Sequence, residues 1–598
     1  MKNSLFALNL LFLFACNTND VVYTDVNLAD LPYEGEKNTK ELLVHELSDP
    51  DKLNPLTSQG AGSSYIEHCM FMYLLDIDKE KLEVIPWLAK ERPKISELTE
   101  GPYKLKIDYE IRKEAIWDNG TPVTAYDVDF SFKTTKNPHV DAEHQRPYID
   151  FVADIIIDEE NPKKFSFLTN ELHYSAEFSS GGVNYIIPEY IYDPEQLMRK
   201  FSLKQLSDKD EIEQIRGDLD LITFAESFNG EKFQREPGFV VGCGPYSLEE
   251  WTTGQRVVLK KKENWWGNAL AGTQSFDNYP EKIIYEIIND KVTAVTATKD
   301  EQIDIMRGVS PYNFKELSTD KAFNSKFFMF NTDFLSYTYI GLNMRHPILK
   351  EKEVRQALAH CVNVPQIIEI IMYGYAKPIG SFVHPSKSHY NTALKPYEFN
   401  LTIAKNLLAS AGWIDSDQDG VLDKEIDGIN TPLRLSIKFN SGNDSREKIC
   451  LFLKEHAKKI GIDLEIQVKE WTVYLDECTN HEFDMYVLGW VQEAVLDDPK
   501  QLFHTDAYNG GSNYTGFGDA YTDVLIDNLR KEMNDEKRTK MFKELQAIVH
   551  EEVPYILLYT PDNLLTISKR FGNAQPYIAR PGYEERELIL KSYQGAQQ

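Results

Sequence analysis

The chain has 598 residues and a formal net charge of −29, with 42% hydrophobic and 12% aromatic residues. This composition excludes a disordered protein, and the length favours two or three domains. The negative charge disfavours nucleic acid as a partner, because phosphates require a basic surface, and it disfavours a large basic patch against a membrane. The six cysteines are widely scattered, which fits neither a disulfide framework nor a zinc site.

The first residues predict export from the cytoplasm. Leu5 to Ala15 form an apolar run that is too short to span a bilayer, which takes about 20 residues, but that suits a signal peptide. Residues 13–16, LFAC, look like a lipobox, in which a signal peptide of residues 1–15 is removed and Cys16 is lipidated. We therefore expect an extracytoplasmic protein that a lipid anchors to a bacterial membrane, at its periplasmic face or at the cell surface. The alternative is an ordinary secretory signal with an incidental cysteine.

Two segments combine a strand and a turn with a further element. Residues 242–267, GCGPYSLEEWTTGQRVVLKKKENWWG, predict a hairpin with strands at 246–251 and 256–259 and Gly254 in the turn. Residues 103–132 predict a strand, an Asn-Gly turn and a helix. Thr124 is a suitable N-cap for that helix, with Asp127 at the third helical position in place of the glutamate of a capping box.

Other segments indicate helices and parallel strands. Residues 65–75 have helical apolar spacing, with Ser63 or Ser64 available as a cap. Strands are expected at 432–443, 462–468 and 483–490, with a helix at 445–460. This alternation predicts parallel strands that are connected by crossover helices.

Four blocks, in this order, resemble family 5 extracytoplasmic solute-binding proteins, the peptide-binding and related receptors of ABC importers. The blocks are residues 103–132, 242–267, 339–385 and 489–503. The resemblance implies an α/β fold of the periplasmic-binding-protein-like type II, with two main α/β lobes, a hinge and a smaller inserted third lobe. Lobe I would comprise residues 16–62, 181–288 and 561–598, lobe II the insertion 63–180, and lobe III the ligand-clamping residues 289–560.

The same resemblance implies a function. The lobes would close about a hinge over a peptide, which the protein would deliver to the permease and ATPase subunits of an importer. It implies a binding protein rather than an enzyme, without a cofactor.

The strand at 483–490 leads into the expected ligand site, because ligands of open α/β sheets bind beyond the carboxyl ends of strands. The family pattern here is GWxxDxxDPxxF, and its first aspartate binds the α-amino group of peptides in the peptide-specific members. This chain reads GWVQEAVLDDPKQLF at 489–503, with Glu493 in the aspartate position and a loop two residues longer. A desolvated ammonium group needs a fixed counter-charge, which Glu493 can supply.

Further ligand contacts are expected from both sides of the cleft. Gly489 and Trp490 would add backbone and ring contacts, and Tyr514 would line the same cleft. Ser58 and Gly60 belong to a loop, TSQG at 57–60, that aligns with one whose backbone hydrogen-bonds ligands in relatives. Glu493 and Trp490 each have an ordinary alternative, a solvated loop carboxylate and a core aromatic residue.

One acidic loop matches the first half of an EF-hand calcium site through Asp415, Asp417, Asp419 and Asp423. The twelfth position is Ile426 rather than the bidentate glutamate, which weakens the match. We expect a plain turn without a metal, with calcium as a weak candidate.

Two other functions stay open. The same fold could carry a nickel chelate, an oligosaccharide or haem, because Glu493 replaces the aspartate and the loop is longer. A secreted glycosidase is a remote alternative, since no Gly-x-Ser-x-Gly, His-Glu-x-x-His or Walker motif supports an enzyme.

Overall fold

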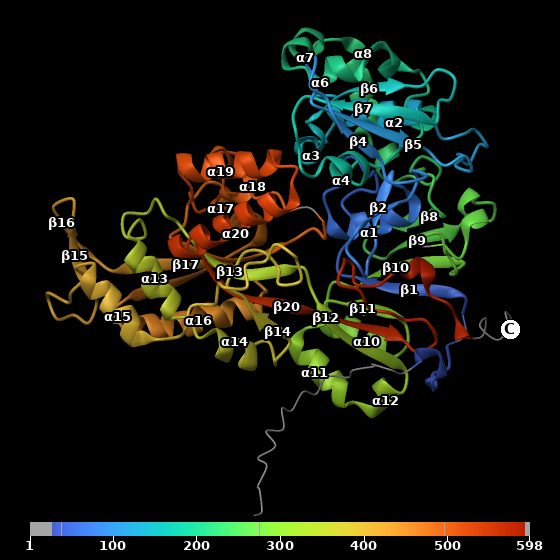
Figure 1. The fold of residues 1–598 in the computed structure, drawn as a ribbon. Coiled ribbons are helices and arrows are strands. Elements are labelled where there is room, and N and C mark those ends of the chain that lie inside the picture. The colour runs from blue at the N-terminus through green and yellow to red at the C-terminus, as the bar shows by residue number, and fades with distance from the viewer. Residues whose placement is uncertain (1–26, 38, 274, 496, 592–598) are drawn as a thin grey trace, which may run out of the picture.

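The computed structural model describes residues 27–37, 39–273, 275–495 and 497–591 (Figure 1). The expected signal peptide, residues 1–15, and the expected lipidation site Cys16 lie outside these residues. Within them, no helix is both long enough and apolar enough to cross a membrane.

A mixed sheet of twelve strands runs through the described part of the chain. Its spatial order is β18 (Asp463–Lys469), β17 (Arg434–Asn440), β19 (Met485–Val491), β13 (Ser336–Leu342), β20 (Tyr555–Ser568), β11 (Ile305–Arg307), β1 (Glu41–Glu46), β10 (Lys282–Ile287), β9 (Arg256–Lys261) and β8 (Tyr246–Thr252). Two further strands, β12 (Phe327–Asp333) and β14 (Ala376–Pro378), pair with β20 beside this path. The long strand β20 joins two halves, since its first residues pair with β13 and its last residues with β11 and β12.

The β1 half of the sheet consists of β1, β8 to β12 and the end of β20. β1 lies parallel to β10, and β10 continues into the antiparallel pair β9 and β8, so the hairpin expected at 246–259 is confirmed. The helices that accompany this half are α1 (Ala61–Met70), α10 (Lys291–Lys299), α11 (Pro311–Thr319) and α12 (Lys321–Asn324).

The β19 half consists of β13, β17 to β19 and the start of β20. β17 lies parallel to both β18 and β19, and a helix connects β17 to β18, which confirms the expected crossover pattern. Its helices are α13 (Lys352–His360), α14 (Val364–Ile370), α15 (Leu401–Ser410), α16 (Asp444–Lys458), α17 (Trp471–Thr479), α18 (Lys500–Phe503), α19 (Ala520–Lys531) and α20 (Asp535–Glu552). A small hairpin, β15 (Asp423–Ile426) and β16 (Ile429–Pro432), lies at the far end of this half (Figure 1).

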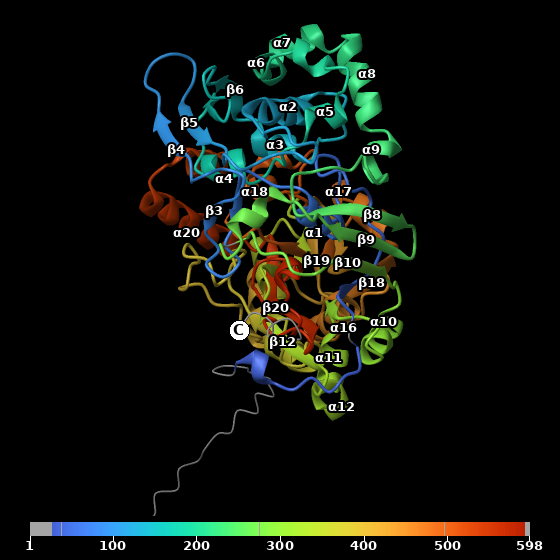
Figure 2. The same cartoon turned by 90° about the vertical axis from the view of Figure 1, so that its right-hand side faces the viewer.

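An inserted region, residues 72–240, separates α1 from β8. Figure 2 shows much of it above β8 and β9, with β12 and β20 below them. It contains the pair β2 (Leu75–Ile77) and β3 (Val84–Pro86) and a four-stranded sheet in the order β4 (Lys94–Glu97), β5 (Leu105–Glu110), β7 (Lys164–Thr169) and β6 (Val152–Ile157). Its helices are α2 (Ala125–Lys136), α3 (Arg146–Ile149), α4 (Ala176–Gly181), α5 (Glu189–Tyr192), α6 (Leu203–Ser207), α7 (Lys209–Ile215), α8 (Leu219–Phe228) and α9 (Glu231–Arg235). The capping box of α2 is confirmed, because the Thr124 amide donates to the Asp127 carboxylate at 2.8 Å.

The helix expected at 65–75 is shifted in the structure, where α1 runs from Ala61 to Met70. The carboxylate of Asp51 accepts hydrogen bonds from the Gly60 amide and the Ser63 hydroxyl, which fixes an earlier start. The chain becomes extended at Phe71, and Met72 then bridges to Ile186. The apolar residues after Met70 therefore lie in extended chain that leads into β2 rather than in a helix.

The contacts differ from the expected lobe limits in two places. β11 and β12 fall within the residues expected for lobe III, yet they pair with β1 and with the end of β20. α8 falls within the residues expected for lobe I, yet the ring of its Phe224 packs edge-on against Phe130 of α2, with 5.9 Å between the centroids. The lobe limits stay a prediction, and these contacts favour a crossover between the halves near residues 333–336.

A buried ion pair ties the β1 half together. Arg570, just after β20, donates to both carboxylate oxygens of Asp304, just before β11, at 2.8 and 2.6 Å. Only 3% of the Arg570 side chain and 1% of the Asp304 side chain are exposed. Arg570 also donates to the Thr39 carbonyl at 2.5 Å, and the Leu43 amide donates to Asp304 at 2.9 Å, so one pair connects three strands.

We predict that Arg570→Met lowers the free energy of unfolding by about 2–3 kcal/mol, because the buried Asp304 carboxylate loses two charge-assisted hydrogen bonds and keeps its pair with Lys37 at 3.1 Å. Urea denaturation followed by circular dichroism measures the change. Glu455→Gln is the control, since it breaks an exposed pair with Lys459 and should leave the midpoint unchanged. Equal midpoints for Arg570→Met and the wild type would contradict the importance of this pair.

Candidate ligand-binding site

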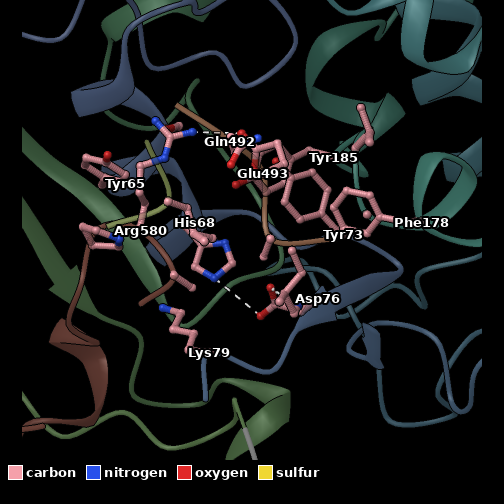
Figure 3. Close-up of a pocket in the computed structure, with 18 of the residues that line it drawn as sticks. Tyr65, His68, Tyr73, Asp76, Lys79, Phe178, Tyr185, Gln492, Glu493 and Arg580 are labelled. Carbon is pink, nitrogen blue, oxygen red and sulfur yellow. Dashed lines mark hydrogen bonds and ion pairs between the residues drawn. The ribbon is translucent and has the colours of Figure 1, made fainter. Parts of the chain in front are cut away.

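A cavity of about 340 Å³, the first chamber, lies where several segments of the chain meet (Figure 3). Its lining comes mainly from α1 with the residues up to 79, from Tyr148 and residues 178–185 of the inserted region, from residues 492–494 after β19, and from residues 579–585 after β20. The rings that line it are Tyr65, Tyr73, Tyr148, Phe178 and Tyr185. A largely aromatic wall that carries a few charged groups is the usual composition of a ligand pocket.

Charged groups stand among these rings. The Nε2 atom of His68 lies 3.5 Å from the Asp76 carboxylate (Figure 3). Lys79 pairs with Glu584. Burial opposes the ionisation of Asp76, but His68 and Lys79 outweigh it and hold the pKa of that carboxyl below its ordinary value. Asp76 is thus a carboxylate at neutral pH.

Glu493 lines the first chamber, and its predicted role as a ligand contact stays a prediction. Its carboxylate accepts a hydrogen bond from Arg580 at 2.8 Å, and 52% of its side chain is exposed (Figure 3). Arg580 lies in the C-terminal segment, 87 residues away in sequence. The contact therefore joins the loop after β19 to the opposite wall of the chamber.

Lys387 contacts the loop after β19 through its buried ammonium group. The side chain of Lys387 is only 4% exposed, and its ammonium lies 2.6 Å from the Asp497 carboxylate and 2.5 Å from the Glu493 carbonyl. His389 approaches the other oxygen of Asp497 at 2.9 Å. Burial alone would raise the pKa of Asp497, but Lys387 and His389 outweigh it and hold that pKa below its ordinary value. One buried cation thus fixes both ends of the segment that carries Glu493.

The inserted region contacts the same loop from above. The hydroxyl of Tyr174 donates to the Asp497 carbonyl at 2.6 Å, and its amide donates to the Arg530 carbonyl at 2.9 Å. Arg530 in turn donates to the Asp498 carboxylate at 2.9 Å. The structure therefore holds the inserted region against the β19 half on this side of the cleft.

Two further cavities adjoin the first chamber. A second chamber of about 450 Å³ shares Tyr148, Gln492 and Glu493 with it. A third chamber of about 540 Å³ shares Phe178 and Ala494 with it. Glu493 lines the first and second chambers, and Ala494 lines the first and third, so a ligand at Glu493 has room on both sides.

Of the other ligand contacts predicted in the β19 half, one lines a chamber and two do not. Trp490 lines the second chamber, and its ring stacks on Tyr514 with 6.1 Å between the centroids. Tyr514 is absent from the described lining of the three chambers, and so is Gly489, which pairs with Thr338 inside the sheet. Their roles as ligand contacts stay predictions, and the geometry makes Tyr514 a support for Trp490.

Ser58 and Gly60 are bonded within their own loop. The hydroxyl of Ser58 donates to Glu67 at 2.9 Å, and the Gly60 amide donates to Asp51 at 3.0 Å. Neither residue is part of the described chamber lining, where α1 presents Ser64, Tyr65 and His68 instead. Their predicted contact with a ligand is untested, and the structure brings Glu493 together with α1 rather than with residues 57–60.

Residues 83–514 match the family model of bacterial extracellular solute-binding proteins, family 5 Middle. The chain belongs to this family. A similar curated relative is the oligopeptide-binding protein AppA of Bacillus subtilis, which is 26% identical over 548 residues, or 90% of this chain and 89% of AppA. The family is one of binding proteins outside the cytoplasm, as the sequence blocks imply.

Solved structures of family 5 proteins share the fold. AppA of Bacillus subtilis in complex with a nonapeptide superposes with a TM-score of 0.70 at 24% identity, covering 94% of this chain and 99% of AppA. NikA of Brucella suis in complex with Fe(III)-EDTA superposes with a TM-score of 0.72 at 18% identity, covering 92% of this chain and 99% of NikA. The expected α/β fold of periplasmic binding proteins is therefore confirmed.

The acidic loop directly precedes the β15 and β16 hairpin, and Asp415, Asp417, Asp419 and Asp423 line none of the three described chambers. Carboxylates of Asp415, Asp417 and Asp419 come within 4.8 Å of one another and are exposed. Asp423 instead accepts hydrogen bonds from the amide and the hydroxyl of Ser416. Three of the four predicted carboxylates thus lie close enough to hold a metal ion, and calcium stays a weak candidate.

Sequence reasoning missed the residues that position Glu493. Arg580 and Lys387 belong to none of the four blocks, and each contacts Glu493 from a distant part of the chain. His68 and Asp76, which line the first chamber, also lie outside the four blocks, and the turn after α1 brings them together.

Glu67 yields a prediction about pH. It is only 1% exposed on α1, and burial raises its pKa to about 8, although the Ser58 hydroxyl partly opposes this. An unfolded glutamate releases its proton near its ordinary value of 4.5, so folding takes up a proton between these two values. Wild-type stability should therefore fall as pH rises through this window.

We predict that Glu67→Gln gains stability relative to the wild type by up to about 1.4 kcal/mol for each pH unit across the window. Urea denaturation of both proteins at pH 5 and pH 8 measures the difference. If the difference in unfolding free energy between the two proteins is the same at pH 5 and pH 8, the folded protein does not hold a neutral Glu67.

Proposed function

We propose that this protein is the extracytoplasmic substrate-binding lipoprotein of an ABC importer, and that it captures peptides between its lobes for delivery to a membrane permease. The observation that carries this proposal is the Glu493 carboxylate, which stands at the first chamber on a loop directly after β19. The carboxyl end of a strand is the usual place for a ligand in an open α/β sheet.

Glu493 would bind the free amino group of the peptide. An ammonium group that enters the chamber loses water and needs a fixed negative charge. A carboxylate accepts several hydrogen bonds, so the ammonium would share Glu493 with Arg580, whose guanidinium contacts one of its oxygens. The remaining main chain would lie along the aromatic wall, where backbone contacts tolerate different side chains.

Closure about a hinge would trap the peptide. The bond from Arg580 to Glu493 and the bonds from Tyr174 to the β19 half all cross the cleft. Opening the lobes would break these contacts, so they support the proposal that this structure represents the closed arrangement.

A solute without an amino group is the alternative cargo, for example a nickel chelate, an oligosaccharide or haem. Its affinity would not depend on the charge of Glu493, which separates the two proposals. We also infer that no bond of the ligand is broken. Hydrolysis of chromogenic glycosides by the pure protein would contradict that inference and favour a glycosidase.

We predict that Glu493→Gln weakens the binding of tripeptides with a free amino terminus by about 2–5 kcal/mol, because the ammonium loses its counter-charge. Isothermal titration calorimetry with free and N-acetylated forms of the same peptides measures the effect. The wild type should prefer the free form, and the variant should distinguish the two forms poorly.

Glu455→Gln, on the exposed face of α16, is the matched control and should bind like the wild type. Unchanged peptide affinity in Glu493→Gln would remove Glu493 from the site. Tight binding of a haem or nickel chelate by both proteins would establish the alternative cargo.

The lipid anchor is a separate proposal that rests on residues 13–16. We predict that Cys16→Ser moves the protein from the membrane fraction to the soluble fraction of the cells that express it, because two or more acyl chains are needed for stable anchoring. Mass spectrometry of the amino-terminal peptide should show an acylated Cys16 in the wild type. A variant that stays in the membrane fraction, with an unmodified wild-type cysteine, would contradict the anchor.

A further inference from the structure

Three residues that line the second chamber carry a buried polar atom without a hydrogen-bond partner in the described parts of the chain. These atoms are the hydroxyl of Tyr337, the side-chain amide oxygen of Gln492 and the indole nitrogen of Trp490. Tyr337 is only 2% exposed, and Tyr337 and Gln492 are the pair that one ligand group can bridge. Buried polar atoms of this kind normally receive a hydrogen bond, so the chamber is built to accept a group that supplies one.

Strand register places these two side chains on one face. Tyr337 of β13 pairs with Trp490 of β19, and the backbone N–H of Gln492 donates to the backbone carbonyl of Leu335 at 2.6 Å. Side chains two residues apart point to the same face of a strand, so Tyr337 and Gln492 are diagonal neighbours, about 7–8 Å apart at their α-carbons. Both can therefore reach one group between them.

The orientation of Gln492 is fixed. Its Nε2 atom donates to the Phe382 carbonyl at 2.9 Å, which leaves Oε1 as a free acceptor. The Tyr337 hydroxyl can donate a hydrogen bond. A single hydroxyl group can satisfy both atoms, since it donates to Gln492 and accepts from Tyr337.

The rest of the chamber selects an aromatic ring. Its wall includes the rings of Tyr148, Phe382, Trp490 and Phe542 beside that of Tyr337. Charged groups on the wall already have partners, among them Asp498 with Arg530 at 2.9 Å and Lys500 with Asp527 at 3.5 Å. The chamber thus offers ring contacts and a paired donor and acceptor, rather than a free charge for a lysine or glutamate side chain.

We propose that the second chamber is a side-chain pocket that selects tyrosine at the first or second residue of the bound peptide. The inference rests on the proposed peptide function, because Glu493 lines both chambers and would place the amino terminus at their junction. A phenylalanine in the same pocket displaces water and leaves both polar atoms unpaired, which costs affinity.

Calorimetry with matched tripeptides tests this pocket on the wild-type protein. The probes are Tyr-Ala-Ala against Phe-Ala-Ala and Ala-Tyr-Ala against Ala-Phe-Ala, with Gln-Ala-Ala and Ala-Gln-Ala as a polar side chain without a ring. At one of the two positions, the tyrosine peptide should bind about tenfold or more tightly than the phenylalanine peptide and the glutamine peptide.

Tyr337→Phe removes the hydroxyl and keeps the ring, so the preference for tyrosine over phenylalanine should fall to about threefold or less. Tyr246→Phe is the matched control, since Tyr246 is a fully buried tyrosine on β8, in the other half of the sheet, and lines none of the three described chambers. It should keep the wild-type preference. Thermal denaturation of both variants shows whether they fold.

The outcomes separate this inference from the proposed function. If tyrosine and phenylalanine peptides bind equally well to the wild type, the tyrosine pocket is wrong and peptide binding stands. A preference that survives in Tyr337→Phe also overturns the pocket. If no peptide binds at all, the proposed function fails and the pocket fails with it.

Discussion

The candidate site depends on one buried cation. Lys387 spans the loop after β19, from the Glu493 carbonyl to the Asp497 carboxylate, and almost none of its side chain reaches solvent. A buried ammonium tolerates few arrangements, because losing either partner would leave a charge unpaired in a low dielectric. Glu493 and Asp497 are therefore held in place before a ligand arrives, which lowers the ordering cost of binding.

The long strand β20 connects the half of the sheet that carries this loop to the β1 half. Because β20 pairs with β13 at one end and with β11 and β12 at the other, both halves of the sheet share one backbone. A relative movement of the halves must then bend or twist the sheet near the middle of β20, beside the crossover at residues 333–336. The contacts that join the cleft walls are hydrogen bonds outside the sheet, two of them from side chains and one between backbone groups, and they can break without loss of the sheet.

Local chemistry explains what the sequence predicts well and what it does not. The capping box of Thr124 and Asp127 and the hairpin at 246–261 depend on neighbours within a few residues, so their signals are present in the sequence. The helix α1 was misplaced because an aspartate nine residues before Gly60 sets its start. Arg580 and Lys387 reach Glu493 across 87 and 106 residues, and no periodicity records such pairings. The family pattern supplied Glu493 itself, but not its partners.

The charges of the cleft are largely satisfied before a ligand binds. Glu493 has Arg580, Asp497 has Lys387, and Asp498 has Arg530. A peptide ammonium at Glu493 therefore replaces or shares an existing bond, and the net electrostatic gain is smaller than the Coulomb energy of the new pair. Part of the affinity must then come from the aromatic walls and from hydrogen bonds to groups that lack a partner within the described residues. Specificity for the peptide's side chains follows the same reasoning, because an unpaired polar atom in a dry chamber penalises a ligand that cannot bond to it.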